Sequence, residues 1–459
     1  MGRRRTSIAR TITSAPASGT LVRELGLGDS ISIIMGIMIG SGIFLMAGSI
    51  ARELNSLAAV LAVWMLGGLM SLAGALSLGE LGAAFPAAGG LYVYLAEAYG
   101  PAVGFIYGWS SISLIYAGSI ATMAAAIGFY TAPLLGLNHW EQKLLQALSI
   151  AFFALVNSLG VSAGKHIQNA LTVLKVVGLA SMVAVLYWRG SARLLRTDLL
   201  PSGHTLEITS FGAALVAVLW AYDGWHVVSF AAGEIRNPGR TLPRALLIGT
   251  VVTTAIYLLA NAAYYAVLSP DAIRATDRVA AAAVQSALGP RAELLISILI
   301  IVSIAGALNG VVLGAPRINL AMARDGLFFR QFAHISRRGH APVVATLALG
   351  AWAILFTLVG SFRELFTSYV FTSWIFYGLS VAAVILLRRR RPQLQRPYRC
   401  PLYPATPIFF VVASMGVIAA TFVTSFWQAI LGVALILMGW PLYFVFRYLE
   451  RDRSEPVEP

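Results

Sequence analysis

Long stretches without a charged side chain alternate along this chain with short segments that carry most of its charge. The uncharged blocks span residues 30–51, 55–79, 98–140, 245–270, 294–316, 365–387 and 400–446. About 20 apolar residues cross a bilayer as a helix, so each block holds a span and the last is long enough for two. With less apolar spans near 143–161, 168–188, 208–232 and 343–360, the pattern predicts an all-α polytopic membrane protein of twelve transmembrane helices.

The composition supports this prediction, because the 459-residue chain is 58% apolar and only 11% charged, with a mean hydropathy of +0.78. A soluble domain carries about a quarter charged residues. Most of the 33 Lys and Arg fall on one side when the N-terminus is placed in the cytoplasm, as the positive-inside rule requires. The net charge of +14 therefore indicates membrane topology rather than nucleic-acid binding. Residues 1–24 and 449–459 are expected to be cytoplasmic tails, the first of them flexible.

The sequence lacks the constellations that catalysis or metal binding requires. Cys400 is the only cysteine, and the six histidines are scattered without the spacing of metal ligands. No nucleophile lies beside a base, and no glycine-rich loop follows a strand. We therefore expect no enzymatic activity, no bound metal and no cofactor.

The first span contains "GIMIGSGIF", in which Gly36, Gly40 and Gly42 weaken a helix at its midpoint. Each interior glycine costs a helix about 1 kcal/mol relative to alanine. On its own, this spacing fits close helix packing as well as a break. However, "LWAYDGWH" (219–226) also interrupts the sixth span with an acid and a glycine. Matched breaks in two halves are typical of an inverted-repeat transporter with a substrate site at the bilayer midplane.

Unwound backbone inside a membrane is costly unless its polar groups line a cavity or bind a ligand. Amides at the start of a half-helix suit a carboxylate, and carbonyls at the end of one suit an ammonium group. The two breaks together therefore predict a site for a zwitterion. Asp223, inside the second break, has two interpretations. It either caps the half-helix that follows, which we prefer, or binds a proton or a cationic substrate.

Several stretches of the chain resemble signatures of the amino acid–polyamine–organocation superfamily. They are "GIMIGSGIF" (36–44), "FPAAGGLYVYLAEAYGP" (85–101), "AGEIRNPGRTLPRA" (232–245), "MARDGLFF" (322–329) and "RRPQLQRPYRCPLYP" (390–404). "WAYDGW" (220–225) is similar to the L-type amino-acid transporter branch. The resemblance covers about residues 24–447 and implies the LeuT-type five-plus-five inverted repeat with helices 1 and 6 broken. The repeats would occupy residues 25–190 and 205–390, with two appended helices in 400–448.

In that family the broken helices hold the substrate through their backbones. The resemblance implies that the substrate α-carboxylate is bound by the amides of Ser41, Gly42 and Ile43. It implies that the α-ammonium is held by the carbonyls of Met38, Trp220, Ala221 and Asp223. Gly40 and Gly224 are the glycines expected to let the two helices open.

The resemblance assigns further roles to side chains. Trp220 takes the place of the aromatic lid over the substrate, Trp374 matches a tryptophan near the side-chain pocket, and Asn309 is expected to face the helix-1 break. Lys175, inside the fifth span, costs about 2.5–3.5 kcal/mol on insertion scales and so needs a partner or a task. It can snorkel to the cytoplasmic boundary. The resemblance favours a coupling role, with the ammonium in the place where sodium-coupled relatives bind a cation, and so predicts sodium independence.

These observations predict a secondary active transporter that carries L-amino acids across the plasma membrane by alternating access. Sodium-independent exchange or facilitated transport of neutral amino acids is preferred; the alternative is proton-coupled uptake of cationic or small amino acids or polyamines. A channel would need a continuous polar lining, which these spans lack. Animal members of the L-type branch attach to a glycoprotein subunit by a disulfide from the loop between helices 3 and 4. The corresponding loop here, 131–141, has no cysteine, so the resemblance implies no disulfide-linked heavy subunit and favours a bacterial inner membrane. The amino-acid substrate and the lipid bilayer are the predicted partners. The sequence pattern does not indicate an oligomeric state.

Overall fold

The computed structural model describes residues 20–54, 56–194, 207–359 and 362–454, and most of these residues are helical. The α-helices are α1 (Leu27–Met38), α2 (Gly42–Glu53), α3 (Leu57–Ala84), α4 (Leu91–Tyr99), α5 (Pro101–Ser110), α6 (Tyr116–Leu135), α7 (His139–Leu159), α8 (Val161–Leu194), α9 (Ile208–Ala221), α10 (Pro238–Val267), α11 (Pro270–Arg274), α12 (Val279–Leu288), α13 (Ala292–Gly314), α14 (Pro316–Arg324), α15 (Val343–Val359), α16 (Phe362–Arg390), α17 (Ala405–Thr424) and α18 (Phe426–Ser454). Three further helical segments are the π-helix η1 (Ser111–Ile115) and the 3₁₀-helices η2 (Val227–Glu234) and η3 (Arg330–Ala333).

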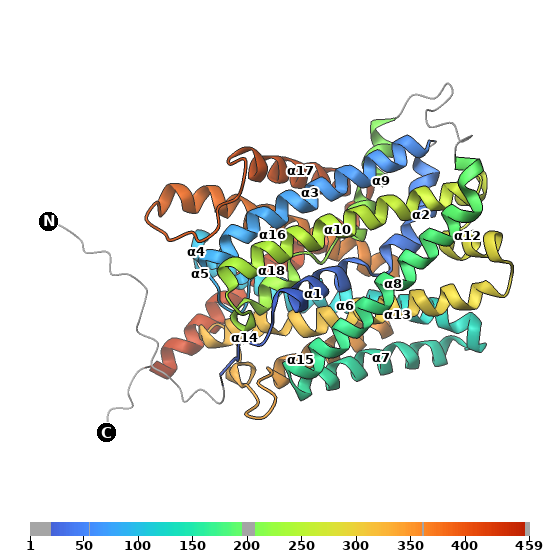
Figure 1. Cartoon of the computed structure of the whole chain (residues 1–459). Helices are drawn as coiled ribbons and strands as arrows, with labels where there is room; N and C mark the ends of the chain where they lie inside the picture. Colours follow the sequence, from blue (N-terminus) through green and yellow to red (C-terminus); the bar gives the residue numbers. More distant parts are fainter. Residues whose placement is uncertain (1–19, 55, 195–206, 360–361, 455–459) are drawn as a thin grey trace.

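The long helices lie side by side and run in roughly one direction across Figure 1. Within the described residues, nine helical stretches are long and apolar enough to cross a membrane, or ten when the bent pair α1 and α2 is counted as one span. Three shorter apolar helices cover Ile208–Ala221, Val279–Leu288 and Val343–Leu358. The predicted class, a polytopic all-α membrane protein, is confirmed.

Both predicted helix breaks are present. Helix α1 ends at Met38, and α2 begins at Gly42 with a bend of 41° between the two. Helix α9 ends at Ala221, and turns follow until η2 begins at Val227. The preferred interpretation of Asp223 as a helix cap is wrong, because no helix begins directly after it.

The two breaks approach each other closely because glycines lie at their contact points. A Cβ atom on Gly42 would lie 2.5 Å from the Cα atom of Ala221, so only glycine lets α2 pack this closely against α9. Gly224 has a φ of +114°, which side-chain-bearing residues rarely adopt, and its Cβ would lie 2.3 Å from Ile37. Gly36 serves packing, since its Cβ would meet Gln168 of α8 at 1.9 Å.

A short backbone bridge joins the segments that flank the two broken spans. The amide of Leu25, just before α1, donates to the carbonyl of Glu234 at 2.9 Å, and the amide of Arg236 donates back to Leu25 at 2.8 Å. This is an isolated parallel bridge between Leu25 and Ile235. The start of α1 and the end of η2 are therefore held together by backbone hydrogen bonds.

The third long span changes its winding at η1, between α5 and α6. A π turn contains more residues than an α turn, so it rotates everything that follows around the helix axis. In this span the first residue after the π turn is Tyr116, which is buried and faces the second break.

The predicted tails lie largely outside the described residues, because 1–19 and 455–459 are not described. Helix α18 continues to Ser454, beyond residue 449 where the second tail was expected to begin. A helix does not have to end at the membrane surface, since polar residues can continue it into water. Residues 20–24 make specific contacts, for example a hydrogen bond of 3.3 Å from Lys165 to the carbonyl of Glu24.

Candidate functional site

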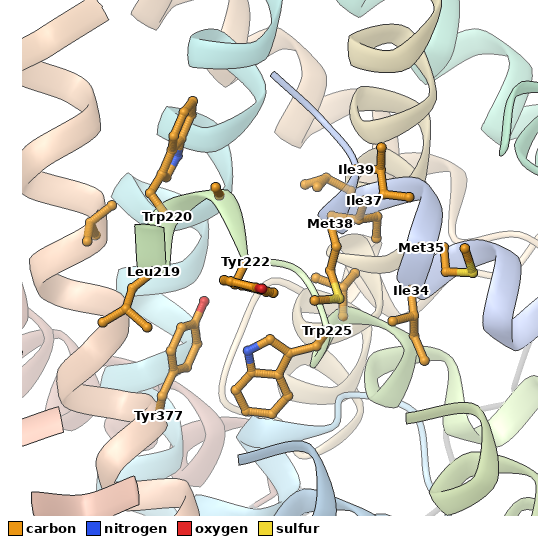
Figure 2. Close-up of a cluster of buried hydrophobic side chains, with 14 of the residues drawn as sticks. Ile34, Met35, Ile37, Met38, Ile39, Leu219, Trp220, Tyr222, Trp225 and Tyr377 are labelled. Carbon is orange, nitrogen blue, oxygen red and sulfur yellow. The ribbon is translucent and has the colours of Figure 1, made fainter. Parts of the chain in front are cut away.

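A cavity lies between the two helix breaks. Figure 2 shows the side chain of Met38, at the end of α1, beside those of Tyr222 and Trp225 in the second break. The predicted site residues that line the cavity are Met38, Gly40, Ser41, Gly42, Trp220, Ala221, Asp223 and Gly224. Sequence reasoning therefore located the backbone part of this site.

The start of α2 presents free backbone amides at this cavity. Gly42 and Ile43 are the first two residues of α2, so their amides have no acceptor one turn back within that helix. Ser41 precedes them, and its carbonyl accepts from Leu45 at 2.9 Å. The positive end of a helix dipole and its free amides favour an anionic group at this place. Ile43 itself is buried and does not line the cavity.

One tyrosine hydroxyl connects the carbonyl ends of the two breaks. Tyr257, from α10, donates to the carbonyl of Met38 and lies 2.9 Å from the carbonyl of Ala221. A hydroxyl has a single hydrogen, so it can satisfy only one of these two carbonyls at a time. The cavity therefore contains carbonyl oxygen that can accept a further hydrogen bond.

Lys175 lies beside the first break and is completely buried. Its ammonium group, on α8, donates to the carbonyls of Gly36 at 2.7 Å, Ile39 at 2.8 Å and Ser303 at 2.5 Å. The interpretation of Lys175 as a snorkelling lysine is therefore wrong. The side chain does not line the cavity; it binds the backbone from which one wall of the cavity is built.

The two predicted tryptophans differ in position. Trp220 lines the cavity, and its indole N–H donates to the hydroxyl of Tyr369 on α16. Trp374 does not line it, and its ring stacks on Phe410 with the centroids 5.6 Å apart. Tyr369 lines the cavity from α16, and Trp374 lies five positions further along the same helix. Five positions correspond to about 140° around an α-helix, so Trp374 faces another side. The expectation that Trp374 borders the side-chain pocket is therefore not met by this structure.

Asn309 also points away from the first break. Its amide accepts a hydrogen bond from Asn157 at 2.9 Å and donates one to Gln168 at 2.8 Å, which places it between α13, α7 and α8. The face of α13 that meets α1 contains Ala307 and Gly310 instead. Adjacent residues are about 100° apart around a helix, so Asn309 turns toward other neighbours.

Sequence reasoning missed the wall of the cavity that α6 supplies. Tyr116, Ser119, Thr122 and Met123 line the cavity from this helix, and Tyr369 lines it from α16. A signal for the α6 face exists in the sequence. Hydroxyl-bearing residues recur three positions apart in a span that is otherwise apolar, and such spacing puts them on one helix face.

A hydrogen-bonded cluster lies directly behind the second break. The hydroxyl of Tyr377, on α16, donates to the carboxylate of Asp223 at 3.0 Å. The Nε2 atom of His226 lies 3.0 Å from the hydroxyl of Tyr116 and 3.2 Å from that of Tyr377. The Asp223 side chain is 22% exposed, whereas that of His226 is 1% exposed. Both residues line the cavity, and the carboxylate is the more exposed of the two side chains.

Buried ion pairs connect helix ends away from the cavity. Glu80, near the end of α3, accepts hydrogen bonds from the side chain of Arg388 at 2.5 and 2.9 Å and from the amide of Cys400 at 2.7 Å. The guanidinium of Arg396 lies 3.3 Å from the same carboxylate. A motif singled out in the sequence, residues 390–404, thus folds over the end of α3.

The fold and the cavity together define a multi-pass membrane transporter whose candidate site is built from interrupted helices. The family model described as amino acid permease matches residues 25–446, which is most of the chain. The chain belongs to this amino acid permease family of the amino acid–polyamine–organocation transporters, and it is a transporter rather than an enzyme.

Similar proteins include known amino-acid carriers. The chain is 33% identical to the serine/threonine exchanger SteT of Bacillus subtilis (strain 168) over 427 residues, covering 92% of this chain and 97% of SteT. It is 32% identical over 439 residues to the b(0,+)-type amino acid transporter 1 of Homo sapiens, covering 94% and 89%. It is 28% identical over 433 residues to the Homo sapiens cystine/glutamate transporter, covering 93% and 85%.

Proposed function

We propose that the chain exchanges L-amino acids across a bacterial inner membrane by alternating access, with neutral amino acids as substrates. The observation that carries the proposal is the cavity between the two breaks, which residues of both breaks line. Free amides of α2 and the under-used carbonyl of Ala221 suit the carboxylate and ammonium ends of an amino acid. SteT, named as a serine/threonine exchanger, supports exchange as the transport mode.

We further propose that the chain has twelve spans arranged as two inverted repeats of five and two appended helices. Ten spans satisfy the length and composition criteria when α1 and α2 are joined. Joining α9 to η2 across its break supplies an eleventh span, and the 17-residue α15 supplies a twelfth. Both termini are then cytoplasmic, in agreement with the positive-inside rule.

Sodium independence follows from the position of Lys175. Three carbonyl oxygens, including two at the unwound end of α1, converge on its ammonium group at 2.5–2.8 Å. Carbonyls freed by an unwound helix are the groups that coordinate a coupling cation in this type of transporter. Because a permanent side-chain donor already satisfies them, we expect no sodium requirement.

A second candidate substrate class is favoured by Asp223. This carboxylate lines the cavity with part of its side chain exposed to it. A carboxylate in this position attracts the cationic side chain of a basic amino acid, and it can also accept a proton. Uptake of cationic amino acids is therefore the alternative to strictly neutral substrates.

We propose that the chain has no disulfide-linked heavy subunit. Cys400, its only cysteine, is 4% exposed and lies against Ser77. Burial is the main cause that raises the pKa of the Cys400 thiol. A buried and protonated thiol is a poor partner for an intermolecular disulfide.

Transport by the purified protein in proteoliposomes tests these proposals. Internal unlabelled amino acid should accelerate the uptake of external radiolabelled amino acid if the chain is an exchanger. Replacing sodium by choline should leave that uptake unchanged. Uptake that stops in choline would contradict the role assigned to Lys175, and uptake of no amino acid would contradict the proposed function itself.

A further inference from the structure

The second break contains a buried imidazole whose hydrogen bonds are incomplete. His226 is 1% exposed, and its Nε2 atom lies within hydrogen-bond distance of two hydroxyls, those of Tyr116 and Tyr377. Its Nδ1 atom has no hydrogen-bond partner among the described residues. The carboxylate oxygen of Asp223 is 3.7 Å from Nδ1, slightly beyond a hydrogen bond. An unpartnered buried polar atom aimed at a carboxylate calls for a physical explanation.

Counting hydrogens shows where one more proton fits. Tyr377 donates its hydrogen to Asp223, so toward His226 it offers only lone pairs. A neutral imidazole with its hydrogen on Nδ1 can donate to Asp223 and accept from Tyr116 at Nε2. A doubly protonated ring would also donate from Nε2 to the two hydroxyls. The cluster therefore has acceptors for one more proton, and in either state Nδ1 reaches Asp223 after a shift of less than 1 Å at the carboxylate.

The groups around this pair supply no competing positive charge. Within the described part of the chain, His226 is the only basic side chain that reaches the carboxylate of Asp223. The other titratable groups that face the pair are tyrosines. They come from α5, α6 and α16, and they are Tyr107, Tyr116, Tyr369 and Tyr377.

Lys175 is bound to carbonyls of α1 and α13 and does not contact this pair. The carboxylate of Asp223 is therefore left with two sources of compensation. One is a proton on His226, and the other is a cationic ligand in the cavity. A buried charge needs such compensation, because leaving it unpaired is strongly unfavourable.

We propose that Asp223 and His226 form a proton site at which the positively charged side chain of a basic amino acid replaces the proton. A neutral amino acid binds while His226 holds the proton, and a basic amino acid binds while that proton leaves to solution. The charge of the occupied cavity is then the same for both substrate classes. This inference rests on the proposed amino-acid transport and specifies how one site accepts both kinds of substrate.

Titration calorimetry of the purified full-length protein tests the inference, with L-serine and L-lysine as probes. Each titration is made in two buffers of different ionisation enthalpy, so that proton release is measured directly. We expect L-lysine binding to release about one proton, and its affinity to rise up to about tenfold per pH unit while His226 is protonated, by linkage. L-serine binding should release none.

The variant His226→Gln should abolish proton release with L-lysine. The same substitution at the exposed His139 of α7 is the matched control and should leave it unchanged. L-lysine binding to the wild type without proton release would overturn the inference, and this measurement needs no variant. Binding of L-serine alone would overturn it while leaving the proposed transport of neutral amino acids intact. Binding of neither amino acid, together with absent uptake, would overturn the proposed function as well.

Discussion

The variant Lys175→Met removes the ammonium group from three carbonyls at the first break, and these carbonyls do not depend on it equally. The carbonyl of Ile39 keeps a hydrogen bond of 2.8 Å from the hydroxyl of Ser303. The carbonyl of Ser303 lies inside α13, where an amide one turn further along is its partner. Methionine fills a similar volume, so no large cavity results.

Gly36 is the residue that loses its partner. In an unbroken helix its carbonyl would accept from the amide of Gly40, but that amide donates to Met38 at 2.8 Å. Lys175, at 2.7 Å, is the donor that replaces it. A buried carbonyl left unsatisfied costs about 1–3 kcal/mol. The broken conformation should therefore be disfavoured by that amount, which weakens substrate binding by about 5- to 150-fold.

The assay is equilibrium binding of the best wild-type substrate to each purified, monodisperse variant. Lys165→Met is the matched control, because Lys165 lies on the same helix but is partly exposed, with Glu24 at 3.8 Å. Such a pair contributes up to about 1 kcal/mol to stability and does not touch the break. A folded Lys175→Met protein with wild-type affinity would refute the reasoning. So would an equal loss in Lys165→Met.

Two further substitutions probe the close approach of the breaks and the ion pair at the end of α3. Gly42→Ala places a Cβ atom 2.5 Å from the Cα atom of Ala221, so substrate binding should fall at least about tenfold, whereas Gly212→Ala, with no atom within 4 Å, should bind normally. Equal substrate affinity in the two variants would contradict the inference that binding requires the close packing of Gly42 against Ala221. Glu80→Gln leaves two guanidinium groups without their carboxylate and should lower the free energy of unfolding by about 3 kcal/mol, measured by thermal unfolding in detergent. Arg391→Gln breaks the ion pair with Glu97, whose side chains are 49% and 37% exposed, and should lower the free energy of unfolding by at most about 1 kcal/mol. A larger loss of stability in Arg391→Gln than in Glu80→Gln would contradict the argument from burial.

The helix breaks were predictable because their cause is local. Glycines clustered inside an apolar span, and an acid beside a glycine in another, change the backbone at the positions where they occur. The sequence therefore placed the ends of α1 and α9 within a few residues. The individual backbone groups at the two breaks were assigned by the family resemblance, and most of the residues that it named line the cavity.

The direction of individual side chains was not predictable in the same way. Trp374 and Asn309 were placed in the correct helices, but each points away from the cavity. The rotation of a helix about its axis is set by packing with several neighbours, and one residue of error turns a side chain by about 100°. Whether Lys175 is buried depends on its depth in the membrane rather than on the rotation of its helix. Its burial became evident only from the packing of α1, α8 and α13 against one another.

The π turn η1 makes the composition of the cavity depend on the number of residues in the third span, and not only on their identity. If the turn became regular α-helix with all its residues kept, every later residue would rotate by about 100° relative to α5. Tyr116 and Ser119 would then leave the cavity although neither had been substituted. A one-codon deletion within the turn would instead remove the extra residue that the π turn absorbs, so α6 would keep both side chains facing the cavity.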